Sequence, residues 1–159
     1  MKFDRALKNF FIVLVSALIL SACSTAKKGA IDTVDDVYTG TETVEYLADG
    51  VPDRVFFATN KSSLTTRSRD TLRKQATWLR KNKDISVTVE GHADERGTRE
   101  YNLALGERRA NAVKDYLMTY GISGNRLNVI SYGKERPVNS GSNPLAWSQN
   151  RRSVTVKAN

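Results

Sequence analysis

At 159 residues the chain has room for one ordinary domain with short appendages, and 40 % hydrophobic with 26 % charged residues excludes a disordered or low-complexity chain. One Cys and one His exclude an internal disulfide and a zinc site built from those ligands, so we expect no metal and no cofactor. The formal charge of +8 does not by itself indicate a nucleic-acid partner, and we expect none, because the cations are spread over solvated helix faces, as at Arg69, Arg73, Lys74, Arg80 and Lys81.

The first 22 residues have the layout of an export signal. Three cations precede an apolar run over residues 10–20, which is shorter than the roughly 20 residues of a membrane-spanning helix. The run ends in the sequence LSAC at residues 20–23, which resembles the bacterial lipobox, where cleavage precedes a Cys that carries lipid such as palmitate. We therefore expect residues 1–22 to be a lipoprotein signal peptide and Cys23 to be the lipid-anchored first residue of the mature chain. By the same resemblance, Ser24 in place of Asp implies sorting to the outer membrane, facing the periplasm.

Residues 23–50 are expected to be a flexible periplasmic tether. The stretch is rich in Thr, Ser, Gly, Asp and Glu, and its apolar residues are too scattered for a helical or a strand period. Fully extended, it would reach about 90 Å. An anchored domain could thus meet a layer some distance from the membrane.

A regular pattern begins after Gly50 and predicts one domain over residues 51–159. Residues 55–57 are typical of a strand, and residues 68–83 of a helix with one apolar face. The strict alternation over residues 85–90 predicts a second strand that packs on one side only.

The second half of this domain is predicted to hold a long helix and two further strands. Apolar residues at three- and four-residue steps predict a helix over residues 98–120, which Gly121 ends. A third strand is expected over 126–132, then a loop through Pro137 and Pro144, then a last strand over 153–157.

The predicted order is therefore β-α-β-α-β-loop-β. Strands joined by helices usually pair in parallel, and one-sided alternation leaves the helices on one face. We expect an α/β (α+β) two-layer sandwich with a mixed sheet and its helices on one face.

The most specific signal is a set of separated motifs around the second strand and second helix. They read GHADERGT at 91–98, YN at 101–102, LGERRANAVK at 105–114, SYGKE at 131–135 and NRR at 150–152. Together they resemble the OmpA-like peptidoglycan-binding domain family, over about residues 51–157. The family's ligand is the diaminopimelate of the peptidoglycan stem peptide, whose side chain ends in an ammonium and a carboxylate.

The resemblance implies two principal ligand-binding residues. Asp94 matches the family's binding aspartate and would accept from the ligand ammonium, while Arg109 matches its binding arginine and would hold the carboxylate through its planar fork. Four further residues are expected to line the site. They are Asn102 two helical turns before Arg109, Thr98 as a candidate N-cap whose neighbouring backbone N–H groups favour a carboxylate, Asn60 after the first strand, and Arg151 on the far side.

Simpler interpretations remain open for these residues. Asp94 could only structure a Gly-rich turn, and Arg109 could pair with Glu107. His92 is expected to be a turn or packing residue, and the two Trp residues to lie in the core or at a rim. One departure from the family is Ala58, which stands where many relatives carry an acidic residue, and its effect on the pocket is left open.

We expect no enzymatic activity and no catalytic residues. A cell-wall hydrolase would need paired carboxylates, for which Glu90, Asp94 and Glu95 are the candidates, but the sequence offers no catalytic Ser motif and no metal-ligand set. A second alternative is a protein-interaction module. Members of the family take part in the Tol-Pal envelope and cell-division system, and the resemblance implies the periplasmic β-propeller of that system as a partner, with wall binding then secondary.

Overall fold

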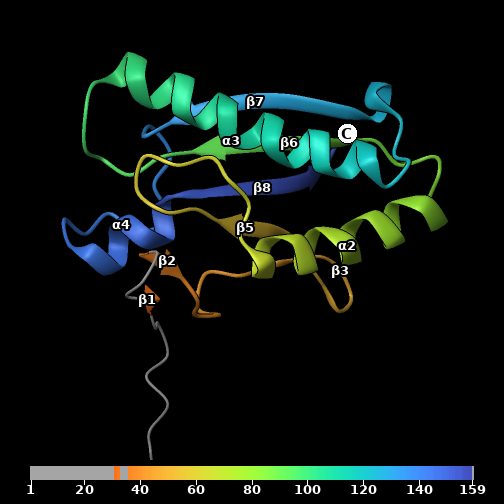
Figure 1. The fold of residues 1–159 in the computed structure, drawn as a ribbon, viewed down its shortest axis with the longest axis horizontal. Helices are drawn as coiled ribbons and strands as arrows, with labels where there is room; N and C mark the ends of the chain where they lie inside the picture. Colours follow the sequence, from red (N-terminus) through yellow and green to blue (C-terminus); the bar gives the residue numbers. More distant parts are fainter. Residues whose placement is uncertain (1–30, 33–35, 159) are drawn as a thin grey trace, which may run out of the picture.

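The computed structural model describes residues 31–32 and 36–158, and its centre is a four-stranded sheet with two long helices on one face (Figure 1). The strands of this sheet are β5 (Arg54–Phe56), β6 (Val87–His92), β7 (Leu127–Gly133) and β8 (Arg152–Lys157). The helices are α2 (Thr66–Lys81), α3 (Arg99–Thr119) and the short α4 (Pro144–Asn150), with a 3-10 turn η1 (Gly124–Arg126). Two small hairpins precede them, β1 (Ile31–Asp32) with β2 (Val37–Tyr38), and β3 (Tyr46–Ala48) with β4 (Val51–Pro52).

The strand order in the sheet is β5-β8-β6-β7. Strands β6 and β7 are parallel across the α3 connection, whereas β8 runs antiparallel to both β5 and β6. The predicted two-layer α/β fold with a mixed sheet is therefore confirmed. The predicted helices and strands all occur, and their bounds differ from the predicted ones by at most two residues at each end.

The core lies between the sheet and helices α2 and α3. Alternation along β6 turns Val87 and Val89 to this side, where both are fully buried, while Thr88 and Glu90 are only partly buried. The helices contribute Leu72, Ala76 and Leu79 from α2 and Ala110, Val113 and Leu117 from α3.

Two glycines let α3 approach β6 closely. A Cβ atom added to Gly91 would lie 1.8 Å from the carbonyl oxygen of Gly106, and one added to Gly106 would lie 2.8 Å from the carbonyl oxygen of Gly91. No larger residue fits at either position without moving the backbone. The contact fixes α3, and with it the loop that joins β6 to α3.

The prediction of a loop between the third and last strands is partly wrong, because this segment contains α4. Asn143 caps this helix, accepting a hydrogen bond at Oδ1 from the backbone N of Ala146 (3.0 Å), and Pro144 is its first residue. Proline fits the first turn of a helix, where its missing N–H would have no partner. Pro144 therefore starts a helix rather than marking an irregular loop.

The segment before residue 51 contributes to the packed structure from Asp36 onward. Tyr38 is fully buried and its ring meets that of Phe56 edge-on at 4.8 Å, and Val37 and Leu47 are buried as well. We expected the tether to reach residue 50. Because Val37, Tyr38 and Leu47 are buried, we place the start of the packed unit at Asp36 instead. Scattered apolar residues give no local period, yet they are buried by contacts with distant strands. The predicted signal peptide, Cys23 and the earlier part of the tether lie outside the described residues.

This packing predicts that a chain beginning at residue 51 is less stable than one beginning at residue 36. Burying one large apolar side chain stabilises a fold by about 1.5–3 kcal/mol, so losing Val37, Tyr38 and Leu47 should lower the free energy of unfolding by roughly 3–8 kcal/mol once the partial burial in the unfolded chain is allowed for. Urea unfolding of both chains measures the difference. Equal midpoints would mean that residues 36–50 add nothing to stability.

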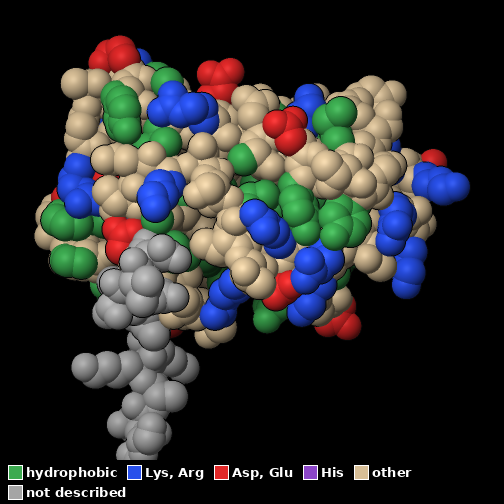
Figure 2. Space-filling model, viewed as in Figure 1, with side chains coloured by type: hydrophobic (Ala, Val, Ile, Leu, Met, Phe, Trp, Pro, Cys, Tyr) green, Lys and Arg blue, Asp and Glu red, His purple; other side chains and the backbone are tan. Residues whose placement is uncertain are grey.

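The cations named on α2 lie in solvent as predicted, whereas Arg54, Arg109, Arg151 and Arg152 are buried. All five helix cations named from the sequence are exposed on α2. Figure 2 shows Lys and Arg side chains over much of this face, with Asp and Glu among them. In the part of the chain that the structure describes, no helix is long and apolar enough to cross a membrane.

Candidate functional site

The loop of residues 93–98 is held between β7 and the start of α3. The backbone N of Ala93 donates to the carbonyl of Gly133 (2.8 Å), and Asn102 on α3 donates through Nδ2 to the carbonyl of Arg96 (2.8 Å). Thr98 is the N-cap of α3, as predicted, and accepts at Oγ1 from the backbone N of Tyr101 (3.2 Å). These contacts fix the position of the Asp94 side chain.

The carboxylate of Asp94 is buried and surrounded by guanidinium donors. Arg96 donates to it from the backbone N (3.1 Å), from Nε (3.2 Å) and from Nη2 (2.7 Å), and Arg151 donates from Nη1 (3.3 Å). Burial alone would raise the pKa of Asp94, but the hydrogen bonds and charge of Arg96, with a contribution from Arg151, hold it below its ordinary value. Asp94 is therefore ionised at neutral pH.

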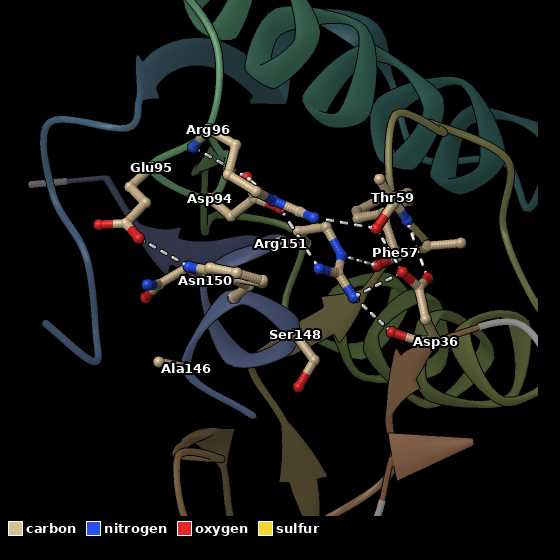
Figure 3. A network of polar contacts seen from close by, with 12 residues as sticks. Asp36, Phe57, Thr59, Asp94, Glu95, Arg96, Ala146, Ser148, Asn150 and Arg151 are labelled. Carbon is tan, nitrogen blue, oxygen red and sulfur yellow. Dashed lines mark hydrogen bonds and ion pairs between the residues drawn. The ribbon is translucent and has the colours of Figure 1, made fainter. Parts of the chain in front are cut away.

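These contacts belong to a closed polar ring that also includes Asp36 and Thr59 (Figure 3). The Oγ1 of Thr59 donates to the Asp36 carboxylate and accepts from Nη2 of Arg96 (3.2 Å). On the other side, Nη2 of Arg151 lies 3.3 Å from Oδ2 of Asp36 and also donates to its backbone carbonyl. The ring runs through Asp94, Arg96, Thr59, Asp36 and Arg151, and back to Asp94.

Arg109 lies fully buried beneath this loop. Its guanidinium donates to three backbone carbonyls, from Nε to Lys61 (2.9 Å), from Nη1 to His92 (2.8 Å) and from Nη2 to Ala58 (3.0 Å). Burial, followed by the charge of Arg151, lowers the pKa of Arg109 to about 10, so it stays positive at neutral pH. These three carbonyls hold the guanidinium inside the fold, away from the surface of the turn.

The structure thus brings some of the predicted site residues together and leaves others apart. Asp94 and Arg151 are in direct contact, and Arg109 is close enough for both to influence its pKa. Asn102 supports the loop from beneath, and Thr98 acts as a helix cap. Asn60 is exposed in the turn after β5, at φ +56, and is not a member of the ring. The alternative of an Arg109–Glu107 pair does not hold, because the Arg109 guanidinium donates to backbone carbonyls.

Sequence reasoning missed three members of the ring. Arg96 stands inside the GHADERGT motif, so its nearness to Asp94 gave a usable signal. Asp36 and Thr59 gave none, since Asp36 lies 23 residues from its hydrogen-bond partner Thr59 and 115 residues from Arg151.

The rim of the site is closed by α4. Trp147 donates from Nε1 to Glu95 (2.8 Å), and the guanidinium carbon of Arg96 lies 4.4 Å from the centre of the Trp147 ring. A hollow of about 170 Å³ lies here, lined by Asp36, Arg96, Pro144, Trp147 and Arg151. It can admit a small charged group, and its walls carry both signs of charge.

Nothing in residues 31–32 and 36–158 groups three or more His, Cys, Asp or Glu side chains as a metal would require. The three carboxylates considered for hydrolysis also have separate partners. Asp94 is bound by two arginines, Glu95 by Trp147 and Ser142, and Glu90 lies beside His92.

His92 is a packing residue, as expected. Its ring is buried 5.5 Å from that of Tyr132, and neither ring nitrogen has a hydrogen-bond partner. Burial, then the charges of Arg152, Arg54 and Arg136, lower the pKa of His92 to about 3, although Glu90 Oε2 lies 3.5 Å from Nε2.

This environment predicts a loss of stability in mild acid. His92 has a pKa of about 6.5 in the unfolded chain and about 3 in the folded chain. Between these pH values the unfolded chain binds a proton on His92 that the folded chain does not bind, so acid favours unfolding. The free energy of unfolding should therefore drop by about 2 kcal/mol between pH 7 and pH 5. His92→Phe should lose this component, which urea unfolding at both pH values would measure. An equal drop in wild type and variant would assign the effect to other groups.

Comparisons with known proteins agree on one family. The model of the OmpA family matches residues 56–151. The peptidoglycan-associated lipoprotein of Rhizobium meliloti is 48 % identical over 149 residues, which cover 91 % of this chain and 85 % of that protein. The protein of the same name from Mesorhizobium japonicum is 45 % identical over 91 % of this chain and 89 % of its own length.

Solved structures agree on the fold. The crystal structure of the peptidoglycan-associated lipoprotein from Burkholderia pseudomallei is 36 % identical, covers 67 % of this chain and 90 % of that chain, and superposes with a TM-score of 0.65.

Proposed function

This chain belongs to the OmpA family, and we propose that it is an outer-membrane lipoprotein whose periplasmic domain binds the stem peptide of peptidoglycan. The binding is non-covalent and ties the outer membrane to the cell wall. The family is not an enzyme family, so the expected lack of enzymatic activity is confirmed on that ground.

The observation that carries the proposal is the ring of alternating charges at the family motif. A diaminopimelate side chain ends in an ammonium and a carboxylate, and a site for it needs an acceptor and a guanidinium within a few ångströms of each other. Asp94 and Arg151 meet that need, with Nη1 of Arg151 3.3 Å from Oδ2 of Asp94. Both side chains are buried, which strengthens their electrostatic interaction with a ligand.

Arg109 adds a second guanidinium to the site. Three of its five N–H groups donate to backbone carbonyls, and the other two remain for a ligand carboxylate. We propose that Arg109 binds this carboxylate from the inner side of the site, with Arg151 on the far side and Asn102, Thr98 and Asn60 shaping the loops around it.

Co-sedimentation with intact, purified peptidoglycan tests the proposal. The full chain should sediment with the wall material and release no soluble fragments from it. Failure to sediment would refute wall binding, and released fragments would instead indicate a hydrolase.

A second partner is proposed at the same face. Arg96 and Trp147 stand partly exposed at the rim, where a protein could contact them, and the periplasmic β-propeller of the Tol system is the partner we propose. Adding the purified propeller to the sedimentation experiment should then release the chain from the wall. Unchanged sedimentation would separate the two surfaces.

The membrane anchor gives a further prediction. The LSAC sequence at residues 20–23 should direct removal of residues 1–22 and acylation of Cys23. Mass spectrometry of the protein purified from membranes should find lipid on an N-terminal Cys23. An unmodified Cys23, or a chain that keeps residues 1–22, would contradict the anchor, and Cys23→Ser should release the protein from the membrane fraction.

A further inference from the structure

The ring at the candidate site contains two kinds of side chain. Those of Arg151 and Asp94 are 3 % and 9 % exposed, and each is held by the sheet or by the loop after β6. Those of Asp36 and Arg96 are 46 % and 42 % exposed and lie on the solvent side of the ring. The first pair is fixed by the fold, and the second pair can turn out into solvent.

The two exposed members have the charges of the proposed ligand. Arg96 places a cation on Asp94, with Nη2 2.7 Å from Oδ2, where the ligand ammonium would bind. Asp36 places a carboxylate 3.3 Å from Nη2 of Arg151, where the ligand carboxylate would bind. Thr59 links the two resident groups through its Oγ1 (Figure 3).

Resting on the proposed function, we infer that the free chain closes its own binding site, with Asp36 in place of the ligand carboxylate and Arg96 in place of the ligand ammonium. The ligand binds by displacing both side chains, which swing into solvent. Occupation by these internal groups lowers the apparent affinity in proportion to the fraction of molecules in which the site is closed.

The backbone at Asp36 supports this role. Its φ of +50 lies in the left-handed region, which costs a residue with a side chain about 1 kcal/mol. The contacts to Thr59 and Arg151 hold it there, with the backbone N of Thr59 donating to Oδ1 at 2.9 Å. Once the Asp36 side chain leaves these contacts, the backbone at this residue is free to leave the left-handed region as well.

Two soluble probes separate the two halves of the closure. One is a muropeptide whose stem carries diaminopimelate, and the other is the same stem with lysine, which keeps the ammonium and lacks the side-chain carboxylate. Asp36→Asn in the full chain should raise the affinity for the diaminopimelate probe about tenfold and leave that for the lysine probe unchanged. Arg96→Gln should raise the affinity for both probes by a similar factor.

Asp49→Asn is the matched control, because Asp49 is exposed in the same segment and outside the ring, and it should change neither affinity. Asp36→Gly is a second variant, since glycine accepts the positive φ, and it should reproduce the effect of Asp36→Asn. Circular dichroism of each variant checks the fold.

The outcomes are distinct. Unchanged or weaker binding of the diaminopimelate probe by both folded Asp36 variants would overturn the role of Asp36. Weaker binding by Arg96→Gln would show that Arg96 contacts the ligand directly instead of occupying the position of its ammonium. If neither wild type nor any variant binds either probe, the proposed function fails and the inference fails with it. Wild-type binding without a gain in the variants overturns the inference alone.

Discussion

Asp94→Ala and Arg109→Lys should each weaken binding to intact peptidoglycan by roughly 10- to 100-fold. Each removes a charge-assisted hydrogen bond to the ligand, which contributes about 1.5–3 kcal/mol, and every 1.4 kcal/mol changes affinity about tenfold. Asp94→Ala removes the acceptor for the ligand ammonium. Arg109→Lys keeps the charge but loses the planar, two-pronged geometry that matches a carboxylate.

The burial of Arg109 decides which substitution to use. Arg109→Ala would leave three backbone carbonyls without their donor inside the fold, so its effect on binding would be mixed with a loss of stability. The full burial of Arg109 argues that Arg109→Ala would not leave the fold intact. Lysine retains a donor and a charge at this position, which makes it the better test.

The measurement is co-sedimentation of each folded variant over a range of protein concentrations. Arg108→Lys and Asp115→Ala are matched controls, because both residues are exposed on α3 outside the ring, and both variants should sediment as wild type does. If folded Asp94→Ala and Arg109→Lys also sediment as wild type does, the site assignment is wrong.

Gly91→Ala should lower the free energy of unfolding by more than about 3 kcal/mol, or prevent folding altogether. The new Cβ would lie 1.8 Å from the carbonyl oxygen and 2.5 Å from the carbonyl carbon of Gly106, and both are backbone atoms of α3 that no side-chain rotation can move. Overpacking a core with one extra methylene typically costs about 1–3 kcal/mol, and a backbone clash of this depth should exceed that range. The helix would have to move away from β6, and the loop bearing Asp94 would move with it.

Gly124→Ala is the matched control, since its Cβ would meet only the flexible side chain of Met118, at 3.4 Å from Cε. Thermal unfolding followed by circular dichroism compares the two. A midpoint for Gly91→Ala within a few degrees of that for Gly124→Ala would show that α3 can shift at little cost.

Several features of the chain could be predicted because they are local. The apolar periods of α2 and α3 and the alternation of β6 depend only on which side of each element is buried, so they can be read from a window of a few residues. Thr98 was predicted as the N-cap of α3 on the same basis. The separated motifs placed Asp94, Arg109 and Arg151 in one region through the family resemblance.

Other features depend on contacts between distant parts of the chain. The insertion of β8 between β5 and β6 could not be predicted, because alternation shows which face of a strand is buried but not which strand lies beside it. The helical role of Pro144 could not be predicted either, because a proline gives the same local signal at the start of a helix as in a loop.

Local patterns and motifs are sufficient to predict the fold class, the position of each long helix and strand, and the loop that carries Asp94. They do not predict that Arg109 lies buried on three backbone carbonyls, or that Asp36, from the expected tether, closes a ring with Arg151 and Asp94. Charged side chains pair according to which of them lie close together in the folded chain, and these can be far apart in the sequence. The arginine and aspartate pattern along the chain does not specify which of many charges will meet once the sheet has formed.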